Sequence, residues 1–242
     1  MHDMQKRFER EIDEIVASSR WLHDLKYVSS HGGNLSYRVA PGVVLVTPTK
    51  VAKQDVGFDD ICIIDENGGI LFAAPGRAPT GETPFHLRIL SRRPDMAAVV
   101  HAHPPILTGF AIAGCDALSR PILPEPAIEV GPVVRVPYAE PLSDDLAAAF
   151  DPVVERANAF LMENHGVIVL SKDGTRRAVE LLEMLEGMAC SILVARECGG
   201  VRELSPDDVG RLDRVLAKRK NALPGLPGTY TALREAFGMQ DG

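Results

Sequence analysis

The feature that most constrains this chain is a short apolar run that ends in two histidines and two prolines. Residues 97–100 are apolar, His101-Ala102-His103 follows them, and Pro104-Pro105 comes directly after. The run predicts a buried strand, and the prolines predict its end. Residues i and i+2 of a strand point to the same side, so His101 and His103 should present two imidazoles together. Because neutral imidazole is a common metal ligand, the pair is a candidate part of a metal site.

Two further segments supply candidate site residues. His165 lies in Asn164-His165-Gly166, between the apolar stretches 159–162 and 167–170, and Glu82 follows Pro79-Thr80-Gly81. Three histidines leave one position of a tetrahedral Zn²⁺ open, as catalytic zinc sites do. A carboxylate beside such a site can exchange protons with a substrate. Two alternatives stay open: single histidines often belong to a core, and Glu82 would also suit the first turn of a helix.

Three loops are candidate anion-binding segments. The first contains Gly33, Asn34 and Ser36, and paired glycines in it allow backbone N–H groups to approach a ligand closely. The second is a loop of hydroxyls that ends in a cation, and the third is the start of a predicted helix. The candidate residues in these two are Thr49, Lys50, Thr80 and Gly81. A tight turn leading into a strand explains the first loop equally well.

The remaining pattern alternates helices and strands. We predict strands at 35–39, 43–46, 61–64, 70–72 and 133–136, a hairpin-like unit at 159–170, and helices at 4–25, 82–91, 105–113, 146–150, 175–196, 206–218 and 230–237. No repeat or mid-chain linker divides the sequence. We therefore expect one α/β domain over residues 1–242, with a core at about 10–200 and a helical tail at 203–242.

Composition excludes several classes of function. The net charge of −7 argues against nucleic acid or an anionic membrane as the main partner. No apolar run approaches the roughly 18 residues of a membrane span, and the charged residues 1–14 do not resemble a secretory signal. The four cysteines form no CxxC pair, so we predict free thiols in a reducing cytoplasm.

Several motifs in this order resemble those of the class II aldolase/adducin family. They are Gly33-Asn34-Leu35-Ser36-Tyr37-Arg38, Thr47-Pro48-Thr49, Pro79-Thr80-Gly81-Glu82, Arg93-Pro94-Asp95, His101-Ala102-His103 and Asn164-His165-Gly166. The similarity covers residues 10–199. It implies an α/β fold with a central, mostly antiparallel sheet flanked by helices, and a homotetramer with active sites near subunit interfaces.

The resemblance also implies roles for individual residues. His101, His103 and His165 would bind Zn²⁺, or another divalent metal such as Mn²⁺ or Co²⁺, and Glu82 would touch the metal in the empty site and act as acid/base with substrate. The loops with Gly33, Asn34, Thr49, Thr80 and Gly81 would hold a substrate phosphate. The implied activity is that of a lyase. It would cleave a ketose 1-phosphate similar to fuculose 1-phosphate into dihydroxyacetone phosphate and an aldehyde, through a metal-stabilised enediolate.

Three departures from the family pattern concern the substrate loops and the proton donor. Lys50 stands where the family usually has glycine, and Thr80-Gly81 replaces two serines. Residues 126–130 lack the tyrosine that reaches a neighbouring site in such aldolases. Tyr230 is our candidate replacement, acting in a neighbouring subunit. Lys50 could instead face solvent, and Tyr230 could be an ordinary residue of the tail.

Other members of the family leave alternative functions open. Pentulose-5-phosphate 4-epimerases carry Asp in place of Glu82, which disfavours that activity. Metal-dependent decarboxylases of hydroxy or oxo acids would use a similar enolate, and Lys50 would suit an acidic substrate. Dehydratases of a methylthio-sugar phosphate are a further possibility. A non-catalytic adducin-like assembly module is the remote alternative, because such modules lack the three zinc histidines.

Overall fold

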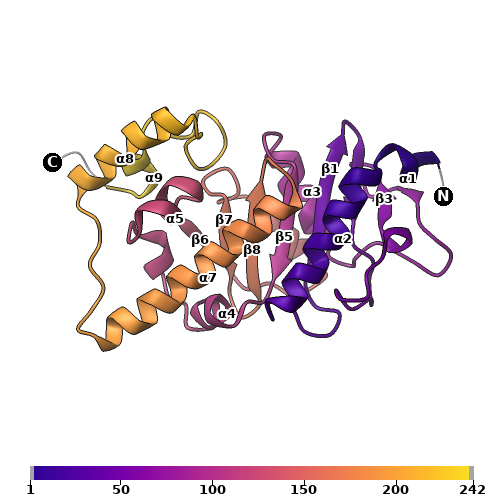
Figure 1. Ribbon diagram of the computed structural model, residues 1–242, viewed down its shortest axis with the longest axis horizontal. Coiled ribbons are helices and arrows are strands. Elements are labelled where there is room, and N and C mark those ends of the chain that lie inside the picture. Colours follow the sequence, from indigo (N-terminus) through magenta and orange to yellow (C-terminus); the bar gives the residue numbers. More distant parts are fainter. Residues whose placement is uncertain (1–2, 240–242) are drawn as a thin grey trace.

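An eight-stranded mixed sheet runs through the part of the chain that the computed structural model describes, residues 3–239 (Figure 1). The strands are β1 (Asn34–Ala40), β2 (Val43–Val46), β3 (Cys62–Ile64), β4 (Ile70–Phe72), β5 (Ala98–Ala102), β6 (Val133–Val136), β7 (Ala159–Met162) and β8 (Gly166–Ser171). Their spatial order is β4-β3-β2-β1-β5-β8-β7-β6, and each neighbouring pair is antiparallel except β6 and β7. The predicted α/β fold with a mostly antiparallel sheet is confirmed.

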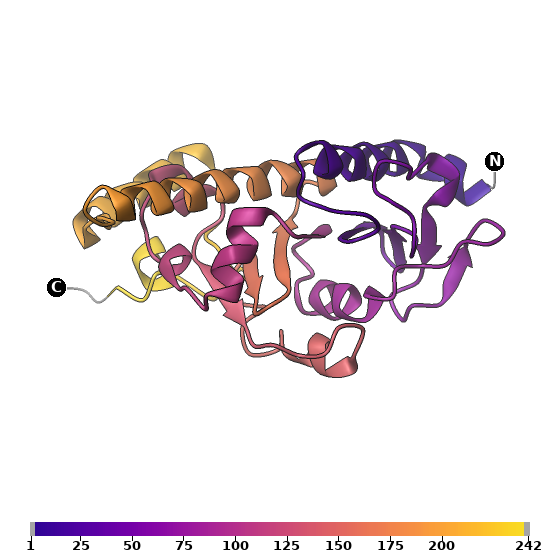
Figure 2. The same cartoon turned by 90° about the horizontal axis from the view of Figure 1, so that it is seen from below.

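Helices cover both faces of this sheet. They are α1 (Asp3–Arg7), α2 (Glu9–Asp24), α3 (Thr83–Arg92), α4 (Pro105–Ile112), α5 (Pro124–Glu129), α6 (Asp144–Ala148), α7 (Thr175–Glu197), α8 (Pro206–Arg219) and α9 (Leu233–Ala236). In Figure 2, α2 and α7 lie along one face, while α3 and α6 lie on the other. No helix within residues 3–239 combines the length and apolar character that a membrane crossing requires.

The alternation of side chains along the strands builds two hydrophobic cores. On β5, Val100 faces the core beneath α2 and α7, whereas Val99 faces the core beneath α3 and α6. The same alternation on β8 separates Val169 from Leu170. Strand β5 is buried along its whole length at the centre of the sheet. A residue at its end is therefore held by packing from both faces.

The structure corrects three predicted elements. The expected helix 4–25 is interrupted at Phe8, whose non-helical φ of −118° separates α1 from α2. Helix α5 was not predicted, because its segment is rich in proline; the fixed φ of Pro124 suits the first turn of a helix. The last helix contains only Leu233–Ala236 and not the predicted 230–237.

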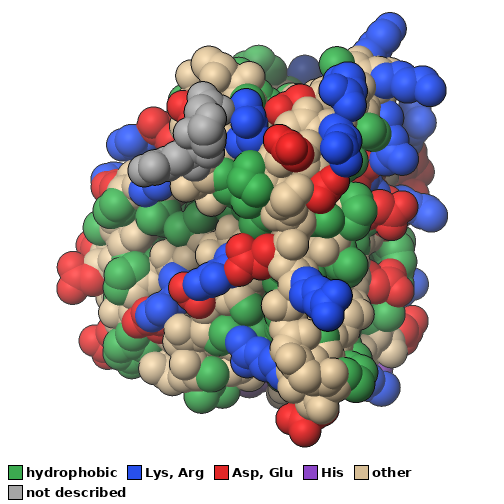
Figure 3. Space-filling model, turned by 90° about the vertical axis from the view of Figure 1, so that its left-hand side faces the viewer, with side chains coloured by type: hydrophobic (Ala, Val, Ile, Leu, Met, Phe, Trp, Pro, Cys, Tyr) green, Lys and Arg blue, Asp and Glu red, His purple; other side chains and the backbone are tan. Residues whose placement is uncertain are grey.

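The C-terminal helices pack against α5 through a small separate core. Val209 and Leu216 of α8, with Leu233 of α9, contact Ala127 and Ile128 of α5. Figure 3 shows this end of the molecule, where basic and acidic side chains intermingle around small apolar patches. Residues 240–242 of the predicted tail lie outside the described part of the chain.

Candidate metal centre

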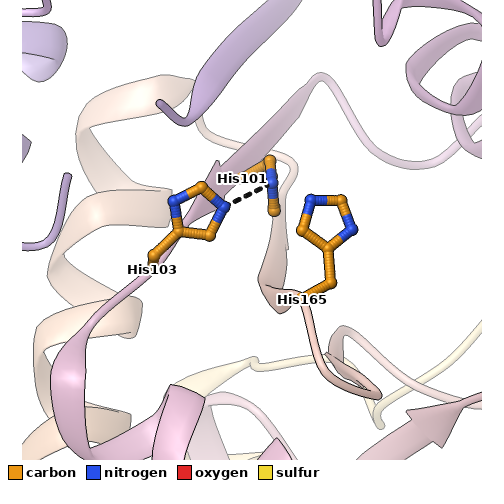
Figure 4. Close-up of side chains that lie close together, drawn as sticks. All are labelled: His101, His103 and His165. Carbon is orange, nitrogen blue, oxygen red and sulfur yellow. Dashed lines mark hydrogen bonds between the residues drawn. The ribbon is translucent and has the colours of Figure 1, made fainter. Parts of the chain in front are cut away.

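Three histidines from two neighbouring strands meet at one end of the sheet (Figure 4). His101 belongs to β5 and His103 follows it, while His165 lies in the turn between β7 and β8. The turn is sharp because Asn164 adopts a left-handed φ of 52°. Gly166 permits the close approach of β8, since a Cβ there would lie 2.5 Å from Cδ2 of His103. The Asn-His-Gly sequence thus explains how the third histidine reaches the first two.

The ring nitrogens of these histidines face one another. One nitrogen from each ring lies within 4.8 Å of the others, and Nε2 of His103 is 3.1 Å from Nε2 of His101. Nδ1 of His101 is 3.0 Å from the carbonyl oxygen of Val167, which requires Nδ1 to carry the hydrogen. The lone pair of His101 is therefore on Nε2, directed toward the cluster.

The surroundings disfavour the protonated form of all three imidazoles. Burial lowers the pKa of His101 well below its usual value, and the proximity of His103 and His165 lowers it further. Burial likewise lowers the pKa of His103 and of His165, although nearby Glu82 acts in the opposite direction. Neutral imidazole is the form that binds metal ions.

Glu82 completes the cluster from the start of α3, on the face of the sheet toward which His101 points. It precedes α3, and the residue is buried, with 8% of its surface exposed. Its Oε2 lies 3.6 Å from Nε2 of His101, and its Oε1 lies 3.4 Å from Nε2 of His165. A carboxylate and three imidazoles thus converge on one point, as the sequence predicted.

This donor set fits a divalent metal ion. A tetrahedral Zn²⁺ with bonds of 2.0–2.1 Å requires nitrogen atoms about 3.3 Å apart, close to the separation of His101 and His103. His101, His103 and His165, with Glu82 as the fourth group, could hold Zn²⁺, Mn²⁺ or Co²⁺.

Two of the predicted anion-binding loops lie side by side near Glu82. The N–H of Thr80 donates to the carbonyl of Thr47 at 3.0 Å, and the N–H of Thr49 donates to the carbonyl of Ala78 at 2.9 Å. Gly81 is exposed beside them. Lys50 is also exposed, and its φ of 59° is the left-handed conformation that glycine adopts most easily. The backbone thus keeps the shape of a glycine turn, although the residue is a lysine.

The third loop approaches the histidines through β1. Asn34 pairs with His101 across the sheet, and Gly33 packs against the carbonyl oxygen of His101. The amide of Asn34 donates to Oε2 of Glu82 at 2.6 Å. Ser36 differs: it is fully buried, and its hydroxyl contacts His86 at 2.8 Å. The geometry gives Ser36 no access to a substrate in this arrangement.

Tyr230 lies away from the other predicted residues. Its hydroxyl donates to the carbonyl of Arg156 at 3.1 Å. Arg156 precedes the start of β7, whereas the histidines lie beyond the end of β7. Within one chain, Tyr230 is thus at the opposite end of the strands.

Sequence reasoning missed two buried polar residues near the cluster, His86 and Lys53. His86 is fully buried on α3, and the Nζ of Lys53 donates to the carbonyls of His31 and Val51, both at 3.3 Å. Burial lowers the pKa of Lys53 to about 8, against a smaller opposing effect of Glu82. The spacing of His86 four residues after Glu82 was the available signal, since both then share one helical face.

Comparisons with known proteins agree with this arrangement. The family model described as the class II aldolase and adducin N-terminal domain matches residues 13–193. The chain is 32% identical to an L-fuculose phosphate aldolase of Methanococcus maripaludis, over 74% of this chain and 94% of the relative. It is 31% identical to a 3-oxo-tetronate 4-phosphate decarboxylase of Pectobacterium atrosepticum, over 77% and 84% of the two chains.

A third relative and one solved structure extend the similarity. A 5-methylthioribulose-1-phosphate/5-deoxyribulose-1-phosphate aldolase of Rhodospirillum rubrum is 32% identical over 85% of this chain and 89% of its own. The crystal structure of YgbL from Klebsiella pneumoniae, a candidate aldolase, epimerase or decarboxylase, superposes with a TM-score of 0.77 at 29% identity, over 84% of this chain and 98% of YgbL. This chain therefore belongs to the class II aldolase and adducin N-terminal domain family.

Proposed function

We propose that this protein is a metal-dependent aldolase that cleaves a ketose 1-phosphate into dihydroxyacetone phosphate and an aldehyde. The observation that carries the proposal is the buried carboxylate of Glu82, 3.4–3.6 Å from two histidines of the cluster. One relative named as an L-fuculose phosphate aldolase and another named as an aldolase of two ketose 1-phosphates support the substrate class.

Different residues of this chain would bind the metal, transfer the proton and position the proton-transferring group. In cleavage, the C3–C4 bond breaks, its electron pair stays on C3, and the C4 hydroxyl loses its proton as the aldehyde forms. A divalent cation on the three histidines would supply Lewis-acid polarisation of the substrate carbonyl. Glu82 would exchange the proton at C3, since a carboxylate beside the reacting centre is suited to general acid/base catalysis. Asn34 would hold Glu82 in place through its 2.6 Å hydrogen bond.

The neighbouring loops would hold the substrate phosphate. Backbone N–H groups of Gly33 and Gly81 and the hydroxyls of Thr49 and Thr80 are suited to phosphate oxygens. The exposed ammonium of Lys50 would add a full positive charge at the rim.

The proton of the C4 hydroxyl requires a second group. We propose that this group, which takes up the proton in cleavage, is Tyr230 of a neighbouring subunit in a homotetramer, because Tyr230 lies at the far end of the strands in its own chain. Helix α5 replaces the segment that carries a tyrosine in similar aldolases, and α8 covers its buried residues.

A decarboxylase of a 3-oxo acid phosphate is the second candidate. The Pectobacterium atrosepticum relative is named for that activity, and its identity to this chain is nearly as high. Lys50 and the buried Lys53 would suit an additional carboxylate.

One paired assay separates these functions. The metal-loaded protein would be given fuculose 1-phosphate, 5-deoxyribulose 1-phosphate and 3-oxo-tetronate 4-phosphate, with dihydroxyacetone phosphate and CO₂ measured in parallel. The aldolase proposal expects dihydroxyacetone phosphate from at least one ketose 1-phosphate, and Glu82→Gln as a control that abolishes its release. CO₂ release without dihydroxyacetone phosphate would replace the aldolase with the decarboxylase.

A further inference from the structure

A chain of four buried polar side chains leads from the interior of the sheet to Glu82. The hydroxyl of Ser36 lies 2.8 Å from Nδ1 of His86. Nε2 of His86 lies 2.5 Å from Oδ1 of Asn34, whose Nδ2 lies 2.6 Å from Oε2 of Glu82. Each of these four residues is at most 8% exposed. Two strand residues are thus joined to the start of α3 by hydrogen bonds alone.

The chemistry of the four groups allows these bonds to run in only one direction. An ionised carboxylate only accepts hydrogen bonds, so the NH₂ group of Asn34 must face Glu82. Oδ1 of Asn34 then faces His86 and can only accept, so Nε2 of His86 must carry the hydrogen. Nδ1 of His86 is left as an acceptor for the hydroxyl of Ser36. Each donor in the chain therefore matches an acceptor.

The position of His86 keeps it in that single form. Burial lowers its pKa to about 3, so the ring is neutral at any pH at which the protein would work. Its ring stacks on Phe85 with centroids 4.6 Å apart and an angle of 19° between the planes. The stack fixes the plane of the ring, and the bond to Oδ1 of Asn34 determines which nitrogen is protonated.

We propose that His86 and Ser36 are positioning residues that fix the orientation of the Asn34 amide and, through it, the carboxylate of Glu82. The opposite orientation of Asn34 would bring its carbonyl oxygen against the carboxylate, which repels it. The N–H on Nε2 of His86 adds a second preference for the same orientation, because it requires the carbonyl oxygen of Asn34 on its own side. The catalytic consequence rests on the proposed role of Glu82 as acid/base, whereas the orientation itself does not.

The first test reads the tautomer of His86 directly. Long-range ¹H–¹⁵N NMR spectra of the metal-free, full-length protein observe the ring protons that a structure only implies. They should show His86 protonated on Nε2 and unprotonated on Nδ1, without change between pH 6 and 8. Ser36→Ala removes the donor to Nδ1 while Oδ1 of Asn34 still accepts from Nε2, so we expect the same tautomer with a shifted Nδ1 signal. A wild-type ring protonated on Nδ1 would overturn the proposal, whether or not the protein is an aldolase.

The second test compares variants that keep the shape of His86 but change its hydrogen bonds. His86→Phe keeps the stacking on Phe85 and removes both bonds, so kcat should fall about tenfold or more with little change in KM, the scale of lost outer-shell partners. His86→Gln keeps an N–H donor directed at Asn34 and should recover most of the loss. His23→Gln, on the half-exposed face of α2, is the control and should leave kcat unchanged.

The two tests separate failure of the proposal from failure of the proposed function. If no variant or wild-type protein cleaves a ketose phosphate, the tautomer measurement still decides the orientation of Asn34. A folded His86→Phe protein with kcat within twofold of wild type would show that His86 does not position Glu82. If His86→Phe does not fold, the same comparison with Ser36→Ala decides, with a fall of about threefold or more expected and an unchanged kcat contradicting the proposal.

Discussion

Buried polar side chains lie at both ends of the central strands, but the two ends differ in how completely these side chains are hydrogen-bonded. Before β5, Arg93 is fully buried and each of its N–H groups has an acceptor. The acceptors are the carboxylate of Asp95, the carbonyls of Val154, Ala157 and Gly225, and Oδ1 of Asn158. Through these hydrogen bonds, Arg93 connects the start of β5 to the segment before β7 and to the C-terminal loop.

At the other end, around the histidines, one buried ring nitrogen lacks such a partner within residues 3–239. Three imidazoles turn ring nitrogens toward one another, and among the described residues Nδ1 of His165 has no hydrogen-bond partner. Burial and mutual proximity lower the pKa of His101, so protonation does not relieve the crowding. A saturated buried cluster stabilises the fold, whereas an unsaturated one is prepared for a ligand.

The largest effect is expected where Arg93, whose N–H groups all have acceptors, is replaced. Arg93→Met leaves Asp95 and several carbonyls without their donor, so we expect a loss of about 3–5 kcal/mol in the free energy of unfolding. The neighbouring Arg92 forms an exposed ion pair with Glu155, and Arg92→Met should cost less than about 1 kcal/mol. Urea unfolding of both variants measures the contrast. Equal losses would mean that saturation of Arg93 does not stabilise the fold.

A second prediction concerns the charge of Lys53 near the unsaturated end. Its pKa is about 8 in the folded protein and about 10.5 when unfolded, so between these values the unfolded chain binds more protons. The stability contributed by position 53 should therefore increase as pH rises from 8 to 10.5, by at most about 3 kcal/mol. The measurement is the difference in unfolding free energy between metal-free wild type and Lys53→Met across this range.

The difference between wild type and Lys53→Met removes the effects of other groups that titrate at high pH. Burial raises the pKa of Cys62 to about 11 and that of Tyr27 to about 12, which lowers stability at high pH in both proteins. These contributions cancel between wild type and variant. A difference that does not change with pH would show that Lys53 is not charged at a cost in the folded state.

The third prediction separates chemistry from metal binding within the unsaturated cluster. Glu82→Gln preserves size and leaves the three histidines in place, so the metal should be retained while kcat falls about 10²-fold or more. Metal content and kcat are measured on the same sample. Near-normal turnover would assign Glu82 a structural role.

The smallest expected effects concern Lys50, whose left-handed backbone is unfavourable for a lysine. Lys50→Gly should leave stability unchanged or raise it by up to about 1 kcal/mol, because glycine adopts φ of 59° without strain. If the ammonium binds the substrate anion, KM should rise about tenfold, the scale of one charge-assisted hydrogen bond.

A matched control exists for the backbone change. Lys220 has a φ of 56° at the end of α8, in the C-terminal tail. Lys220→Gly should give a similar stability change with no change in KM. A KM for Lys50→Gly within twofold of wild type would place that side chain in solvent.

The sequence predicted those parts of the fold and site that depend on local pattern. The i, i+2 spacing of His101 and His103 and the Asn-His-Gly turn at His165 are visible in a few residues, and the structure brings them together. The alternation that defines β5 and β8 is equally local. Helix α5 could not be predicted from its proline-rich segment, because proline begins some helices and breaks others.

The polar interior could not be predicted in the same way. The glycine-rich turn before Ser36 predicts a substrate-binding residue, but the partner of Ser36 in the structure is His86, 50 residues away. Lys53 contacts the carbonyl of His31, 22 residues away. Contacts between residues far apart in the sequence decide which buried polar groups have hydrogen-bond partners, and no local pattern predicts these contacts.

The most direct test of the central claim is the metal content of purified wild type and His103→Ala, measured by mass spectrometry after dialysis against Zn²⁺ and removal of free metal. We predict about one divalent ion per wild-type chain and almost none in the variant, with an unchanged circular dichroism spectrum, because the variant loses one of three ligands. Equal metal in the two proteins, or none in wild type, would contradict a metal centre at these histidines.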